Sequence, residues 1–273
     1  MVVQCSNNRS SIEYSAIMEN SHSPRHDAPA PRAVLFDAYG TLFDVYSVAQ
    51  LAEQLFPGRG QALSLLWRDK QIEYTRLVTT SRRYGQLGTP DISPPFYRPF
   101  GELTRAALVY AIKKIAGNDP ATLGKAEIDS NIDQLMAQYR KLDAFGDARE
   151  VLAALKARGI PTGILSNGDP EMLGAVVRNA GLADLLDHVI SVDRVRHYKT
   201  HPEAYALGVH AIGAPPEKIV FVSSNSWDAL GAAWYGYTTL WSTAPVCRSC
   251  GLGAELLERP PHWTPCLNFS RPD

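Results

Sequence analysis

The sequence has few cysteines, no excess of one charge and no long hydrophobic run. Four cysteines are too few to cross-link a chain of 273 residues into a disulfide framework. The 27 basic and 28 acidic residues almost cancel, so the composition gives no sign of nucleic acid or an anionic lipid surface as a partner. No apolar stretch approaches the ~20 residues of a membrane-spanning helix. We therefore expect a protein that binds neither nucleic acid nor membrane.

The two ends of the chain differ in composition from the rest. Residues 1–31 are rich in Ser, Asn, Pro and His, which predicts a disordered tail. Their order does not resemble a secretory signal, so a cytoplasmic location is expected. Near the other end, Cys247 and Cys250 form a CxxC pair, with His262 and Cys266 downstream. Such residues can bind zinc, but their irregular spacing favours reduced cysteines in a loop.

The hydrophobic pattern predicts an all-helical block followed by an α/β block. A short apolar run ends at Phe36 and indicates a buried parallel strand. Helical periodicity then dominates, with no strand signal between Asp44 and Tyr139. The helices predicted in this block cover residues 45–56, 61–79, 101–116 and 128–139. Between the second and third of them, residues 84–99 contain many Gly and Pro residues and indicate a long loop.

From Gly146 onward, helices and short apolar strands alternate along the chain. This alternation predicts a parallel sheet with helices on both faces. The predicted strands cover residues 161–165, 189–192, 219–222 and 238–241, and the helices cover 148–158, 171–180, 202–212 and 227–235. We therefore expect an α/β fold with a Rossmann-like, doubly wound parallel sheet as its core, formed by residues 32–44 and 141–273. Residues 45–140 would form an inserted, all-helical cap domain.

Polar side chains follow several of the predicted strands. They belong to the segments 37–41, 166–168, 198–199 and 223–228. Because parallel strands share a carboxyl edge, these segments are expected to meet in one crevice. Asp37 is fixed there by its strand and open to the crevice, which suits a carboxylate nucleophile. Two residues later, where a second acid would serve as a proton donor, the chain has Tyr39.

These segments resemble the motifs of the haloacid dehalogenase superfamily and, more narrowly, those of the L-2-haloacid dehalogenases. The resemblance covers about residues 32–263. Residues 36–45 are similar to the first motif, 164–168 to the second and 221–229 to the fourth. Residues 56–60 and 67–74, within the helical block, are similar to the same subfamily.

The sequence departs from the phosphatases of this superfamily at two positions. Those enzymes carry a second aspartate two residues after the nucleophile and an acidic pair that helps to hold magnesium. Here the corresponding residues are Tyr39 and the pair Ser224 and Asp228. A halide leaves without a proton, so it requires neither the acid nor the metal. The resemblance implies hydrolysis of short (S)-2-haloalkanoic acids to (R)-2-hydroxy acids with inversion, through an ester on Asp37 and without metal or organic cofactor.

The resemblance also implies a division of roles among the remaining residues. Arg68 and Asn167 would bind the departing halide, and Ser166 would bind the substrate carboxylate with two backbone amides. Lys199 would keep Asp37 ionised, and Asp228 would orient Lys199 and the hydrolytic water. The residues expected to act in catalysis are Asp37, Thr41, Arg68, Asn167, Lys199, Ser223, Asn225 and Asp228. Those expected to contact substrate are Ala38, Tyr39, Arg68, Ser166, Asn167, Phe100, Tyr205 and Trp227.

Three other functions stay open from the motifs. The first is a magnesium-dependent phosphatase, which Tyr39 and Ser224 disfavour. The second is a hydrolase of a small cyclic imino acid, which would use the same nucleophile. The third is a binding protein that retains the pocket without turnover. A homodimer is implied by the resemblance, and the long loop at residues 84–99 is expected to alter the preferred substrate length.

Overall fold

The structure is a computed structural model that describes residues 30–81, 96–116 and 124–242. Nearly all of the predicted tail lies outside these ranges, as do most of the Pro-rich loop, the CxxC pair, His262 and Cys266.

A five-stranded parallel sheet forms the core of the described chain. Its strands are β1 (Ala33–Phe36), β2 (Thr162–Ser166), β3 (His188–Ser191), β4 (Ile219–Ser223) and β5 (Thr238–Trp241). They lie in the order β3-β2-β1-β4-β5, and every pairing is parallel. The predicted parallel sheet is therefore confirmed. All four residues of β1 are buried, as expected for a central strand covered on both faces.

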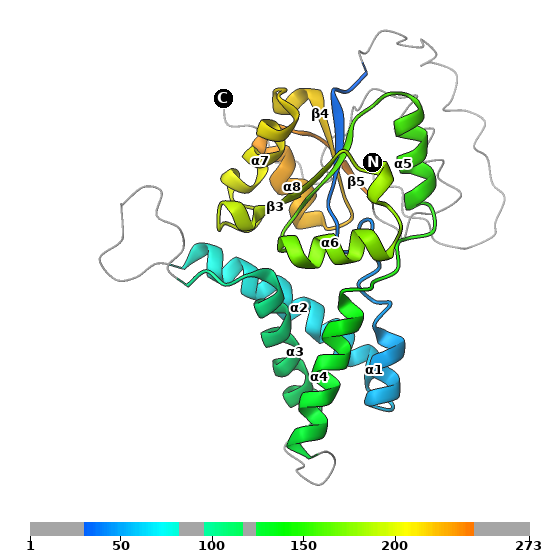
Figure 1. Cartoon of the computed structure of the whole chain (residues 1–273). Helices are drawn as coiled ribbons and strands as arrows, with labels where there is room; N and C mark the ends of the chain where they lie inside the picture. Colours follow the sequence, from blue (N-terminus) through cyan, green and yellow to red (C-terminus); the bar gives the residue numbers. More distant parts are fainter. Residues whose placement is uncertain (1–29, 82–95, 117–123, 243–273) are drawn as a thin grey trace, which may run out of the picture.

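Helices flank both faces of this sheet. They are α5 (Ala148–Ala157), α6 (Pro170–Asn179), α7 (Pro202–Ile212) and α8 (Ser226–Tyr235). From β1 the chain proceeds to β2 and β3 on one side, then returns to β4 and β5 on the other. Because crossovers between parallel strands are right-handed, the helices that precede this reversal and those that follow it lie on opposite faces of the sheet. Figure 1 shows α5 across the sheet from α7 and α8. The reversal creates a topological switch point between β1 and β4, where ligands bind in open α/β sheets.

In the described chain, four helices are inserted between β1 and α5. They are α1 (Ala49–Leu55), α2 (Gly60–Thr80), α3 (Phe100–Ala116) and α4 (Lys125–Tyr139). They gather beyond the carboxyl end of β1, with α2 packed against both α1 and α3 (Figure 1). No strand lies between residues 44 and 139 in the described part of the chain, which agrees with the prediction. The domain boundaries at residues 44/45 and 140/141 remain a prediction.

The helix predicted from residue 45 begins four residues later than expected. The Asp44 carboxylate accepts a hydrogen bond from the Tyr46 amide at 2.8 Å, and the Ser47 hydroxyl donates to the Asp44 carbonyl at 2.8 Å. These local bonds stabilise a turn, because Asp and Ser side chains compete with the helical pattern. Three short 3-10 turns, at Ala183–Leu185, Val192–Arg194 and Pro216–Lys218, were also not predicted.

Hydrogen bonds join the inserted helices to the sheet core. Asp169 caps α6 through the Met172 amide, and its second oxygen accepts the Gly101 amide of α3 at 2.8 Å. The Tyr97 hydroxyl donates to Asp193 at 2.6 Å, just before α3 begins. These bonds hold the start of α3 beside the carboxyl edge of the sheet. No helix in the described ranges has the length and apolar character needed to cross a bilayer.

Candidate active site

Asp37 lies directly after β1, at the switch point, and its side chain is almost completely buried. One carboxylate oxygen accepts hydrogen bonds from the Thr41 hydroxyl at 3.1 Å and the Asn225 amide at 2.8 Å. The other accepts from the Lys199 ammonium at 3.1 Å. Gly40, at φ +94°, allows the chain to turn immediately after Asp37. The carboxylate is thus held by three donors from three segments of the chain.

Lys199 joins Asp37 to a second buried carboxylate. Its fully buried ammonium donates to Asp37 at 3.1 Å and to Asp228 at 2.9 Å. Its backbone amide donates to the side-chain oxygen of Asn167 at 2.9 Å, which positions the loop after β3. Burial alone lowers the pKa of Lys199, but the charges of Asp228 and Asp37 more than offset this and raise the pKa above its usual value. The lysine therefore stays charged between the two carboxylates.

Asp228 lies in the first turn of α8 and is completely buried. One oxygen accepts from Lys199 and from the Ser223 hydroxyl at 3.0 Å, and the other accepts from the Tyr205 hydroxyl at 2.8 Å. Burial raises the pKa of Asp228 to about 6, because the attraction of Lys199 opposes only part of the desolvation. Asp228 is therefore ionised at neutral pH and titrates below it.

Arg68 brings a second cation to the site from α2. Its guanidinium donates to the Tyr39 carbonyl at 2.9 Å and to the Asn225 side-chain oxygen at 3.2 Å. A third bond, to the Gln71 side chain at 2.7 Å, fixes the guanidinium from within the same helix. Gln71 in turn accepts from the Tyr139 hydroxyl at 3.1 Å. The inserted helices and the sheet core thus both contribute charged groups to one site.

Aromatic rings pack around Tyr39, two residues after Asp37. The Tyr39 ring centroid lies 5.3 Å from that of Phe100 and 5.6 Å from that of Tyr139. The Tyr39 hydroxyl is buried and has no hydrogen-bond partner among the described residues. Burial raises the pKa of Tyr39 well above its usual value, so the phenol stays neutral. Tyr39 and Phe100 therefore form an apolar surface of the kind predicted for the substrate's alkyl group.

The remaining predicted residues occupy different parts of the site. Ser166 is completely buried at the end of β2, and its hydroxyl accepts the Gly168 amide at 3.1 Å. Ala38 is buried in the turn after Asp37. Tyr205 is buried beside Asp228. Trp227 is partly buried, and the Arg76 guanidinium lies over its ring, 5.1 Å from the ring centroid. The contacts of Tyr205 and Trp227 with substrate remain predictions, as do the catalytic roles of the whole set.

Sequence reasoning missed three residues that support this arrangement. Gln71 and Tyr139 hold Arg68, and Asp169 ties α3 to α6. Gln71 follows Arg68 by three residues in a predicted helix, a spacing that places both on one face. Asp169 precedes Pro170, and Asp before Pro is a common start of a helix. Tyr139 gave no comparable signal, because its contact with Gln71 is made between distant helices.

Comparisons with known proteins agree with this geometry. The profile of the haloacid dehalogenase-like hydrolases matches residues 31–236. The chain is 40% identical over 228 residues to an (S)-2-haloacid dehalogenase of Xanthobacter autotrophicus, an alignment that covers 84% of this chain and 78% of the relative. It is also 40% identical over 210 residues to haloacetate dehalogenase H-2 of Moraxella sp. (strain B), covering 77% of this chain and 84% of that one.

Solved structures show the same relationship. The crystal structure of the L-2-haloacid dehalogenase RSc1362 is 52% identical, with a TM-score of 0.67 over 78% of this chain and 86% of that one. The Xanthobacter autotrophicus enzyme with chloropropionic acid covalently bound is 37% identical, with a TM-score of 0.66 over 84% and 85% of the two chains. Together with the matching profile, these relatives show that the chain belongs to the haloacid dehalogenase-like hydrolase family.

Proposed function

We propose that this protein hydrolyses short (S)-2-haloalkanoic acids to (R)-2-hydroxy acids with inversion of configuration. The observation that carries the proposal is the buried carboxylate of Asp37, which accepts a hydrogen bond from the Lys199 ammonium at 3.1 Å, two residues before the aromatic cluster of Tyr39 and Phe100. An anionic nucleophile in such a setting suits displacement of a group that leaves without a proton. The relatives named as (S)-2-haloacid dehalogenases support the same reaction.

The proposed reaction has two steps. The Asp37 carboxylate attacks the carbon that bears the halogen, from the side opposite to the halogen. A carbon–oxygen bond forms, and the carbon–halogen bond breaks with its electron pair on the halide. Water then attacks the carboxyl carbon of Asp37 and cleaves its bond to the ester oxygen. The hydroxyl oxygen of the product therefore comes from Asp37, and each turnover leaves one oxygen from water in the enzyme.

The charged groups around Asp37 suit these steps. Arg68 and Asn167 are proposed to stabilise the departing halide, because fixed donors lower the energy of a developing anion. Ser166 and the backbone amides of Ala38 and Tyr39 are proposed to bind the substrate carboxylate.

Further residues are proposed to act on the enzyme ester and on the substrate's apolar end. Asp228 accepts a proton from the hydrolytic water and returns it to the ester oxygen as that oxygen leaves, a role consistent with its pKa of about 6. Thr41, Ser223 and Asn225 orient the oxygen atoms of Asp37 and Asp228. Phe100 and Trp227 contact the apolar part of the substrate together with Tyr39, and Tyr205 supports Asp228 from behind.

The test is halide release from each enantiomer of 2-chloropropionate in the presence of EDTA. We expect release from the (S) enantiomer only, abolished in Asp37→Asn and retained in Asp143→Asn, which replaces an exposed aspartate. A single turnover in ¹⁸O-labelled water should place the label in Asp37 rather than in the product. No release from either enantiomer would refute the proposed substrate, and phosphate esters with magnesium and small cyclic imino acids would be tested next.

A homodimer and a cytoplasmic location are further proposals based on the resemblance. Light scattering after size-exclusion chromatography tests the first of them directly. A mass equal to one chain of 30.0 kDa would contradict the homodimer.

A further inference from the structure

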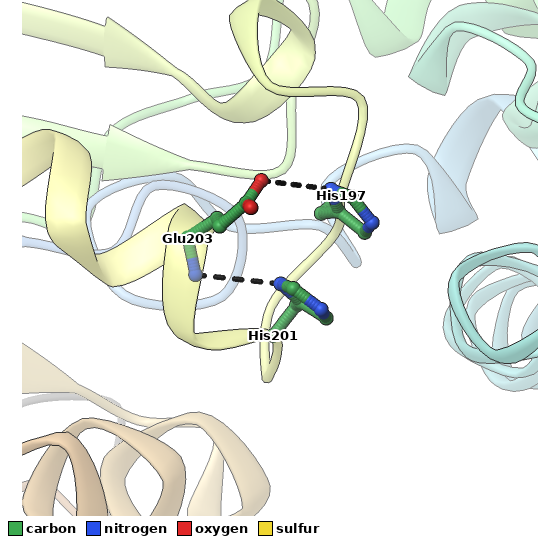
Figure 2. Close-up of side chains that lie close together, drawn as sticks. All are labelled: His197, His201 and Glu203. Atoms are coloured by element: carbon green, nitrogen blue, oxygen red, sulfur yellow. Dashed lines mark hydrogen bonds and ion pairs between the residues drawn. The ribbon is translucent and has the colours of Figure 1, made fainter. Parts of the chain in front are cut away.

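Two histidines and a glutamate meet outside the crevice, where the loop after β3 enters α7. His197, His201 and Glu203 each offer a ligand atom, and these atoms all lie within 4.8 Å of one another. Figure 2 shows the two imidazole rings one over the other, with Glu203 beside them. Their centroids are 3.9 Å apart, and the planes are 17° from parallel. His197 is buried and the other two residues are partly exposed, so the cluster is fixed yet reachable from solvent.

The distances within the cluster approach those of a metal site. Bonds of ~2.0–2.1 Å to a tetrahedral zinc ion place neighbouring ligand atoms about 3.3 Å apart. The His197 Nδ1 atom lies 3.2 Å from the Glu203 carboxylate, close to this value. It also lies 3.0 Å from the Val195 carbonyl, so a metal ion at Nδ1 would replace that hydrogen bond. The spacing His197-x₃-His201 is also one that recurs in zinc proteins. A modest rotation of the imidazole rings would bring the remaining ligand atoms within reach.

A purely structural role does not account for this set of residues. The His201 Nδ1 atom accepts the Glu203 amide at 3.3 Å and so acts as the N-cap of α7. Asn, Asp and Ser perform that role better than histidine. Capping also does not require a second imidazole stacked on the first, nor a carboxylate 3.2 Å from it. The three side chains together are the donor set of a transition-metal site.

We propose that His197, His201 and Glu203 bind a divalent transition-metal ion, with Zn²⁺ as the preferred example. Two imidazoles favour zinc, nickel and copper, whereas magnesium and calcium prefer sites made of oxygen ligands. The partial positive charge at the start of α7 opposes a cation, and the Glu203 carboxylate offsets it. Water would complete the coordination, because His201 and Glu203 are partly exposed. This site is separate from Asp37 and does not depend on the proposed reaction.

Metal binding would restrain the segment that carries Lys199. Lys199 lies midway between the two histidines in the sequence, and its side chain is fixed between Asp37 and Asp228. An ion held by residues 197, 201 and 203 would cross-link both ends of this segment. Zinc is therefore expected to slow amide hydrogen exchange in residues 197–203 more than in the rest of α7.

The test is calorimetric titration of the full-length protein with ZnCl₂. All four cysteines are first replaced by serine, because thiolates also bind zinc. We expect one equivalent of zinc and no binding of MgCl₂. His201→Asn keeps a good N-cap but removes the imidazole, and should weaken binding by at least about tenfold, since loss of even a group supporting a metal ligand costs ~10–100-fold. His210→Asn makes the same change at an exposed position of α7 and should leave binding unchanged.

Glu203→Gln provides a second variant with little risk to folding, because its side chain is 42% exposed. It should also weaken zinc binding, with hydrogen exchange in residues 197–203 no longer slowed. Equal zinc affinity in the parent, His201→Asn and Glu203→Gln proteins would overturn the proposal. The absence of zinc binding by the four-serine parent would overturn it as well.

Discussion

Replacing Lys199 with methionine should destabilise the protein strongly, because it leaves two buried carboxylates without their shared cation. The ammonium lies 3.1 Å from Asp37 and 2.9 Å from Asp228, and its side chain is 0% exposed. At an effective dielectric constant of ~20, each contact is worth about 5 kcal/mol before desolvation. Desolvation of the lysine offsets much of this sum. Breaking such a buried pair is expected to lower the free energy of unfolding by ~3–5 kcal/mol.

The measurement is urea unfolding at pH 7.5, followed by circular dichroism. With a slope of ~3 kcal/mol per molar urea, the midpoint of the Lys199→Met variant should fall by ~1–1.7 M. Lys113→Met replaces an exposed lysine of α3 and should leave the midpoint unchanged. The double variant Lys199→Met/Asp228→Asn should recover much of the loss, because only one buried carboxylate then remains. The unfolding of Asp228→Asn alone completes the cycle.

Two results would refute this reasoning. The first is a loss below about 1 kcal/mol in Lys199→Met, a value typical of exposed ion pairs. The second is a double variant that is no more stable than Lys199→Met, which would place the cost in lost packing rather than in charge.

Three further predictions concern the network around Asp37. Folding raises the pKa of Asp228 from 3.8 to about 6. The contribution of this group to the free energy of unfolding is therefore complete below pH 3.8 and is lost as the pH rises through about 6. Halide release should increase over the same range, and a pH series with wild type and Asp228→Asn should show both changes only in the wild type. Tyr205→Phe removes a donor to Asp228, so the acid limb of the rate profile should move to higher pH and urea unfolding should show a loss of ~1.5–3 kcal/mol. Arg68→Lys cannot make all three bonds of the guanidinium, so kcat for halide release should fall about 10²-fold with little change in unfolding.

The Tyr205→Phe and Arg68→Lys predictions each have a matched control and an opposing outcome. Tyr110→Phe and Arg105→Lys alter exposed side chains of α3 and should behave as the wild type. If the acid limb of the rate profile lies at the same pH in Tyr205→Phe as in the wild type, protonation of Asp228 does not cause that limb. If kcat in Arg68→Lys equals that of the wild type, Arg68 does not contact the reacting atoms.

The sequence predicted the elements of the fold well, because their signals are local. Every strand of the described sheet coincides with an apolar run in the sequence. The helix α7 begins at Pro202 and ends before Gly213, as the sequence indicates. The start of α1 was wrong because Asp44 forms a turn with its own neighbours, which hydrophobic periodicity does not report. The short 3-10 turns escaped prediction for a similar reason.

The part of the site that lies at the carboxyl ends of the strands could be predicted from the sequence. Parallel topology brings Asp37, Lys199 and Asp228 to one edge, so their proximity could be expected from the sequence. The contact of Arg68 with the Tyr39 carbonyl could not, because it depends on how the inserted helices pack over the sheet. The cluster at His197, His201 and Glu203 carries a zinc-like spacing, but only the fold places the glutamate against the first histidine.

The central position of β1 also determines the order in which this enzyme becomes competent during synthesis. Asp37 leaves the ribosome long before its partners Lys199 and Asn225, which follow 162 and 188 positions later. Until β2 and β4 have been made, β1 has two unpaired edges and its carboxylate has none of these donors. The inserted helices, whose contacts are local, can form earlier. A chain arrested before Asn225 would therefore carry its nucleophile without activity, and during refolding the helical signal should recover before halide release.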